Sequence, residues 1–141
     1  MTTKIKIQIK NRWTGSVLFE YEKEKNTIKD TLLEAVKQGA YLRGADLGGA
    51  DLGGAYLGGA NLGGANLGDW GKLQDILTAG PLGSRKAYTT CYKTDKGIFV
   101  QCGCFKGTLD EFVAKVKQTH KGNTHERDYL ALVEFVKVKL Q

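Results

Sequence analysis

The sequence contains few of the residues from which metal and cofactor sites are built. Its 141 residues include three cysteines (Cys91, Cys102 and Cys104) and two histidines. The single residue between Cys102 and Cys104 is shorter than the Cys-x₂-Cys spacing of zinc knuckles, and the histidines lie on either side of a predicted helix break. We expect buried thiols in a sheet, with a zinc site as the alternative, and no cofactor. So few cysteines, without a secretion signal, indicate a reduced cytoplasmic protein.

Long apolar runs and catalytic signatures are also absent from the sequence. No run approaches the ~18 apolar residues of a membrane-spanning helix, and the N-terminal residues alternate charged with apolar side chains. Residues 80–86 (Gly-Pro-Leu-Gly-Ser-Arg-Lys) contain the only proline but lack the Gly-Lys-Ser/Thr ending of a P-loop. No Cys–His nucleophile signature is present. We therefore expect neither a membrane protein nor an enzyme.

Acidic residues are in the minority, with 15 Asp and Glu against 21 Lys and Arg and a net charge of +6. This balance favours an anionic partner. The C-terminal lysines, however, alternate with apolar residues and have no interleaved aromatic residues of the kind found in single-strand binders. They predict solvated helix faces rather than a nucleic-acid stripe.

Glycine is abundant, with 19 copies, and pairs of glycines recur within residues 40–69. This segment reads as six units of five residues, such as Ala45-Asp-Leu-Gly-Gly, each with Ala first and Leu third. A period of five fits neither an amphipathic helix nor a strand. A fixed period with one large apolar residue predicts a repeat that buries its own axis. The paired glycines either relax the turns or leave bare backbone that a ligand or another chain could approach.

These units resemble the pentapeptide-repeat family, whose pattern is Ala-(Asp/Asn)-Leu-X-X. The second place conforms to this pattern in four units, at Asp46, Asp51, Asn61 and Asn66. It departs from the pattern in two units, at Tyr41 and Tyr56. The resemblance implies a right-handed, four-sided β-helix in which residues twenty apart stack at roughly ~4.8 Å. Leu47 would then lie under Leu67, and Tyr41 beside Asn61.

The flanking segments complete a predicted fold that is mainly β with flanking helices. Residues 1–39 form a β-hairpin and capping helix, residues 40–69 the short right-handed quadrilateral β-helix, and residues 70–141 a small α+β domain with an antiparallel sheet and two helices. Six units make only about one and a half coils, and solenoids need roughly three stacked units. We therefore expect the flanking segments or a second subunit to supply stability.

Local signals place the flanking elements. Alternation over residues 4–9, a turn cluster at 11–15 and a second strand at 17–21 predict a hairpin over residues 4–21. Trp13, near its tip, is expected to be a packing residue or, alternatively, an exposed recognition residue. Asn26 or Thr27 is expected to cap the first helix. Thr108-Leu-Asp-Glu111 is a capping box that begins the second. The last helix, roughly 125–140, has a wide apolar surface, which is buried on two sides or pairs with another subunit.

The loop at 80–86 is the predicted ligand site. Its backbone N–H groups, the Ser84 hydroxyl, Arg85 and Lys86 suit a phosphate or carboxylate, the alternative being an ordinary solvated loop. Tyr88 and Arg43 complete the set of expected ligand-binding residues.

Short motifs outside the repeat, such as Asn11-Arg-Trp-Thr-Gly-Ser-Val and Gln101-Cys-Gly-Cys, are similar to those of small phage-encoded pentapeptide-repeat proteins. This implies action in the cytoplasm of a bacterial host. We predict a non-enzymatic homo-oligomer that sequesters an anionic small ligand, such as a nucleotide signal of host defence. The alternatives are a protein–protein inhibitor of a host factor, such as a DNA mimic toward topoisomerase, and a binder of nucleic-acid phosphates. A DNA mimic needs a long acidic surface, which this short repeat in a basic chain does not supply.

Overall fold

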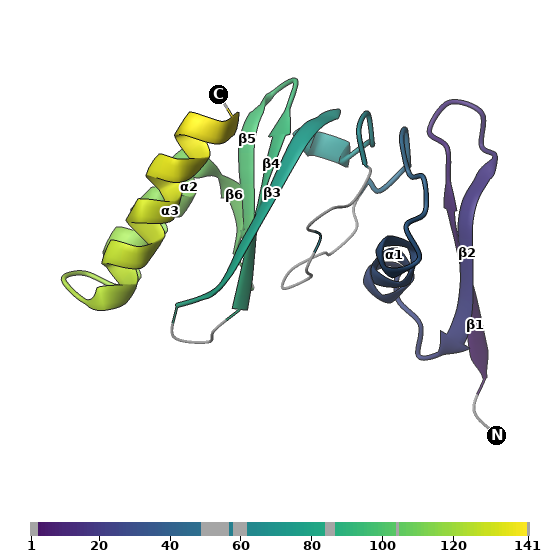
Figure 1. Ribbon diagram of the computed structural model, residues 1–141, viewed down its shortest axis with the longest axis horizontal. Coiled ribbons are helices and arrows are strands. Elements are labelled where there is room, and N and C mark those ends of the chain that lie inside the picture. The colour runs from purple at the N-terminus through teal and green to yellow at the C-terminus, as the bar shows by residue number, and fades with distance from the viewer. Residues whose placement is uncertain (1–2, 49–56, 58–61, 84–86, 104, 141) are drawn as a thin grey trace.

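The computed structural model describes residues 3–48, 57, 62–83, 87–103 and 105–140. Six strands are present: β1 (Lys4–Lys10), β2 (Val17–Glu24), β3 (Leu73–Leu82), β4 (Ala87–Thr94), β5 (Gly97–Cys102) and β6 (Phe105–Thr108). The helices are α1 (Ile28–Lys37), α2 (Leu109–Thr119) and α3 (Thr124–Leu140), with a short 3-10 turn, η1 (Gly68–Trp70). Figure 1 shows the hairpin β1–β2 at one end, α2 and α3 at the other, and the described residues of the repeat between the hairpin with α1 and the larger sheet.

The N-terminal unit follows its local sequence signals. β1 pairs antiparallel with β2, and Ile9, close to the turn, is fully buried. Thr27 is the cap of α1, because its side chain accepts the N–H of Asp30. Asn26 instead ties the helix to the hairpin: its amide donates to the carbonyls of Ile5 and Tyr21 and its oxygen accepts from the Thr31 hydroxyl. The predicted hairpin strands and helix are present.

Strands β3 to β6 form a four-stranded antiparallel sheet in sequence order. The capping box that begins α2 is confirmed, with Thr108 accepting the N–H of Glu111 and Glu111 accepting the N–H of Thr108. α2 and α3 pack on one face of this sheet (Figure 1). On α3, Phe135 and Val138 remain 48% and 79% exposed, so the single chain does not bury this helix on two sides. The homo-oligomer stays a prediction.

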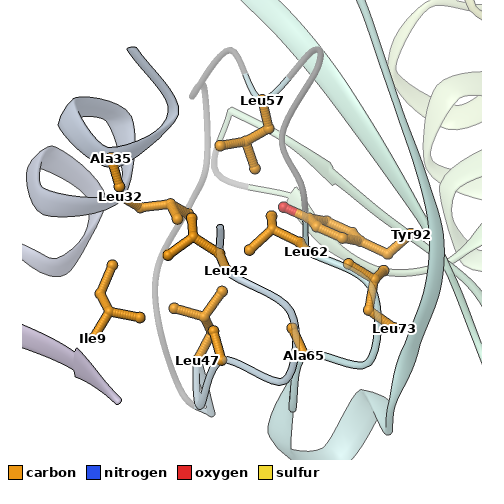
Figure 2. Close-up of a cluster of buried hydrophobic side chains, with 11 residues drawn as sticks. Ile9, Leu32, Ala35, Leu42, Leu47, Leu57, Leu62, Ala65, Leu73 and Tyr92 are labelled. Carbon is orange, nitrogen blue, oxygen red and sulfur yellow. The ribbon is translucent and has the colours of Figure 1, made fainter. Parts of the chain in front are cut away.

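Two hydrophobic clusters lie on either side of the larger sheet. The first joins the hairpin, α1, the repeat and the sheet, through Ile9, Leu32, Ala35, Leu42, Ala45, Leu47, Leu57, Leu62, Ala65, Leu73 and Tyr92. Figure 2 shows the repeat leucines pointing between α1 and Tyr92 of the sheet. The second lies between the sheet and the helices α2 and α3. The division of the chain at residue 70 stays a prediction, and the first cluster continues across it to Leu73 and Tyr92.

The predicted quadrilateral β-helix is wrong for the part of the chain described here. All six strands belong to two antiparallel sheets, and the described repeat residues contribute only isolated bridges. One bridge, Asp46 to Asn66, is parallel and spans twenty residues. The turns at Gly44 and Gly64 have φ of +74° and +76°, which interrupts any strand there. The expected pairing of Tyr41 with Asn61 lies outside the described residues.

The repeat segment is held by its neighbours rather than by its own coils. The Asp46 N–H donates to the Lys10 carbonyl at 2.8 Å on the hairpin side, and the Leu73 N–H donates to the Ala65 carbonyl at 2.8 Å on the sheet side. Its inward leucines belong to a core that the flanking segments complete. The expectation that the flanking segments supply stability to the repeat agrees with this arrangement.

Candidate functional site

The predicted ligand residues do not come together in the described structure. Ser84, Arg85 and Lys86 lie outside the described residues. Tyr88 is half-buried on β4, close to the pairing of Leu82 with Ala87 at the end of β3. Arg43 is exposed on a repeat turn near the opposite end of β3 from that loop. The turn that stacks on it, at Gly64, donates its N–H to the carbonyl of Leu73, the first residue of β3. The loop with Tyr88 stays a prediction, and Arg43 belongs to a different surface.

That surface is built on the bare glycine turns of the repeat. The Arg12 N–H in the hairpin turn donates to the Gly44 carbonyl at 2.8 Å. The Gly44 N–H donates to the Gly63 carbonyl at 2.9 Å, and the Gly64 N–H donates to the Leu73 carbonyl at 2.8 Å. The hairpin tip, two repeat turns and the start of β3 are therefore stacked by backbone hydrogen bonds. What approaches the bare backbone is the chain's own hairpin.

Trp13 both packs on this stack and faces solvent. A β-carbon at Gly44 would lie 2.7 Å from Cζ3 of Trp13, so only glycine leaves room for the indole at that turn. The side chain is nevertheless 64% exposed. The carboxamide oxygen of Asn11 accepts the N–H groups of Trp13 and Thr14 at 2.9 and 3.0 Å, which fixes the turn. Trp13 therefore packs on the repeat as expected and is also exposed, and a recognition role for it stays a prediction.

Two cations from separate segments lie near the indole, and a third lies on the adjoining repeat turn. The guanidinium carbon of Arg12 lies 4.8 Å from the centre of the Trp13 ring, and the Lys72 ammonium lies 5.9 Å from it. Arg12 also donates to the Gly64 carbonyl at 3.3 Å. The Nε of Arg43 lies 3.6 Å from the β-carbon position of Gly63, on the turn adjoining Gly64. We call Arg12, Trp13, Arg43 and Lys72 the tip surface.

The electrostatics of the tip surface favour anions. Within the described part of the chain, the side chains of Arg12, Arg43 and Lys72 form no ion pair with a carboxylate. Asp95 approaches only the backbone of Lys72, whose N–H it accepts at 2.9 Å. Arginine can pair two oxygens of a phosphate or carboxylate at once, and an indole attracts both cations and planar rings. The surface can therefore hold an anionic group beside a stacked ring.

Arg43 is among the ligand residues expected from the sequence, whereas Arg12 and Lys72, which approach Trp13, are not. The adjacent Arg12-Trp13 in a turn, with the bare glycine corners of the repeat, is a signal that could have indicated the hairpin side. No local signal marks Lys72, because its approach to Trp13 depends on how β3 leaves the repeat.

The thiols and imidazoles do not form a metal site in the described residues. Among those residues, no group of three or more His, Cys, Asp or Glu side chains could hold a metal ion. Burial raises the pKa of the Cys91 thiol to about 12, and burial together with the neighbouring Cys102 raises the pKa of Tyr129 to about 12. The Cys102 thiol donates to the Tyr129 hydroxyl at 3.7 Å, and His120 stacks on Tyr129 with ring centres 5.7 Å apart. In the described residues these groups pack on one another.

The helices of the described residues are also too short or too polar to cross a bilayer.

Comparison with families of known proteins gives a match over the repeat: residues 38–69 fit the model for pentapeptide repeats, in eight copies. The sequence pattern gives six five-residue units over residues 40–69. Neither the curated proteins nor the solved structures compared with this chain match it. The chain therefore resembles the pentapeptide-repeat family over residues 38–69, less than a quarter of its length.

Proposed function

We propose that this protein is a non-enzymatic binding protein that holds an anionic ligand with a planar ring, such as a nucleotide, on the tip surface. The observation that carries the proposal is the indole of Trp13, which is 64% exposed with a guanidinium 4.8 Å and an ammonium 5.9 Å from its ring centre. A base can stack on the exposed indole while Arg43 and Lys72 pair with phosphate oxygens. The net charge of +6 favours the approach of such a ligand.

The biological version of this proposal is the sequestration of a nucleotide signal. The motifs that flank the repeat resemble those of phage-encoded proteins, and a phage protein acting in a bacterial cytoplasm would counter host defence by removing its messenger. Sequestration needs affinity without turnover. A surface made of cations and one indole suits that task.

Calorimetry with cyclic and linear mononucleotides tests the proposal. The intact chain is compared with Trp13→Ala, Arg43→Gln and, as the matched control, Arg127→Gln, an exposed arginine on α3. We expect at least one nucleotide to bind, a loss of about tenfold or more in both tip variants, and no change in the control. Absence of binding at tens of micromolar, or full affinity in Arg43→Gln, would overturn the proposal. Full affinity in both tip variants, with a loss in a triple change of Ser84, Arg85 and Lys86, would move the site to the loop.

Single-stranded nucleic acid is the second candidate, because it too is held by aromatic stacking and backbone cations. An oligonucleotide series separates the two. Affinity that grows with oligonucleotide length and falls steeply with salt indicates a nucleic-acid binder, whereas saturation by a mononucleotide supports the small-ligand proposal. A DNA-mimicking inhibitor of topoisomerase is not favoured, since the tip surface carries cations.

A further inference from the structure

A second basic site lies where the larger sheet meets the ends of α2 and α3. A cleft of about 420 Å³ opens between the β4–β5 turn, the start of α2 and the last turns of α3. Figure 1 shows the C-terminal end of α3 beside the sheet. This volume is within the range of small-molecule sites, roughly 300–1,000 Å³. The cleft shares no residue with the tip surface, so it raises a separate question about what it holds.

Among the described residues, the charged groups that line the cleft are three lysines and one carboxylate. Lys93 comes from β4, Lys96 from the β4–β5 turn, Lys137 from α3 and Asp110 from α2. We call this the lysine cleft. Three ammonium groups against one carboxylate make it cationic. Its members lie up to 44 residues apart in the sequence (137 − 93), so tertiary packing assembles it.

The three lysines differ in whether their ammonium groups already have an ion-pair or hydrogen-bond partner in the chain. The Lys137 ammonium lies 3.6 Å from the carboxylate of Glu134, and the Lys96 ammonium donates to the Asp69 carbonyl at 3.3 Å. Lys93 is half-buried and, within the described residues, forms neither an ion pair nor a side-chain hydrogen bond. An anion in the cleft would supply that partner.

The walls of the cleft are apolar. Leu109 and Leu140 belong to the cluster between the sheet and the helices, and Ile98 packs against the same cluster. The capping box at the start of α2 uses the N–H groups of Thr108 and Glu111. The lysines together with the apolar walls define what fits the cleft.

We propose that the lysine cleft binds a small amphipathic anion. Its apolar body would lie against Ile98, Leu109 and Leu140, and its carboxylate or phosphate head would lie between Lys93 and Lys137. The head compensates the unpaired Lys93, and the body removes apolar surface from water. The proposal does not depend on the tip surface or on a nucleotide ligand.

Calorimetry with four probes tests the proposal on the full chain. Octanoate and octyl phosphate carry both parts of the expected ligand, octanol lacks the charged head, and inorganic phosphate lacks the apolar body. We expect octanoate or octyl phosphate to bind at least about tenfold more tightly than octanol and inorganic phosphate. Tighter binding of either amphiphile supports the proposal and identifies the preferred head. Equal binding of octanol, or of inorganic phosphate, would overturn it.

Matched variants place the binding in the cleft. Lys93→Met keeps the apolar stem and removes the charge, and Lys115→Met makes the same change at an exposed position of α2 outside the cleft. We expect about a tenfold loss in the first and none in the second. Lys137→Met serves as a second cleft variant should Lys93→Met fold poorly. Trp13→Ala should keep full octanoate affinity, so the outcomes for the two sites stay distinct. Unchanged affinity in both cleft variants would refute the site.

Discussion

Gly44 lies against the indole of Trp13 so closely that a β-carbon at residue 44 would come within 2.7 Å of Cζ3. One glycine of the repeat thus makes room for the exposed ring that leads our functional proposal. The same turn receives a backbone hydrogen bond from Arg12 at 2.8 Å. The glycine pairs, which weaken the repeat as a coil, are what allow the hairpin tip to dock on it.

Comparing alanine at Gly44 with alanine at Gly39 separates the cost of the steric clash from the cost of backbone strain. Gly44→Ala should lose about 2–3 kcal/mol of unfolding free energy, because it combines a left-handed φ with a clash against Trp13. Gly39→Ala is the control: its φ of +70° is close to the +74° of Gly44, but nothing lies within 4 Å of the added β-carbon. There we expect only the strain, about 1 kcal/mol. Equal losses in urea denaturation would show that Trp13 does not require the glycine.

The buried pair Tyr92 and Gln101 should behave as one unit. The Tyr92 hydroxyl donates to the Gln101 side-chain oxygen at 2.8 Å, and both residues are buried. Tyr92→Phe and Gln101→Leu each leave one buried group without this partner, at about 1–3 kcal/mol each. The double variant should lose less than the sum of the two single losses. Additive losses in urea denaturation would mean that the hydrogen bond contributes nothing to the free energy of unfolding.

Cys91 should resist alkylation in the folded protein. Burial raises the pKa of its thiol to about 12, so at about pH 8 almost none of it is the reactive thiolate. Iodoacetamide labelling followed by peptide mass spectrometry should modify half-buried Cys102 before Cys91. In urea both should react at similar rates. Comparable labelling of Cys91 and Cys102 without urea would contradict this burial.

The capping box at the start of α2 should make stability depend on pH. The backbone N–H of Thr108, and then its side chain, hold the pKa of Glu111 below its ordinary value of 4.5. Because the folded pKa is the lower one, the stabilisation is present above pH 4.5 and is lost as the pH falls through the folded value.

The variant Glu111→Gln tests this dependence, because glutamine can still cap but does not titrate. Thermal unfolding from about pH 7 to about pH 3 should show a smaller loss of stability below pH 4.5 in Glu111→Gln than in the wild type. Glu22→Gln, an exposed position on β2, is the control and should follow the wild-type curve. Identical acid profiles for the wild type and Glu111→Gln would contradict the proposed contribution.

The local elements were predictable because their signals act within a few residues. The Thr108–Glu111 box spans one helical turn, and the alternation that ends in buried Ile9 spans one strand. The β-helix was not predictable in this way, because the described repeat residues form turns and isolated bridges, and the strands all lie outside the repeat. The positive φ at Gly44 and Gly64 places turns there instead, and the neighbouring hairpin and sheet pair with them.

The sequence by itself determined the repeat, the hairpin, the helix caps and the apolar residues of the core. Only the tertiary structure decided the candidate sites. Arg12 reaches the Gly64 carbonyl across 52 residues of sequence, and Lys72 approaches Trp13 from the start of β3. Local periodicity carries no information about such contacts, because they depend on which turn stacks on which. That choice is made by backbone hydrogen bonds between distant segments and by the core that the hairpin, repeat and sheet bury together.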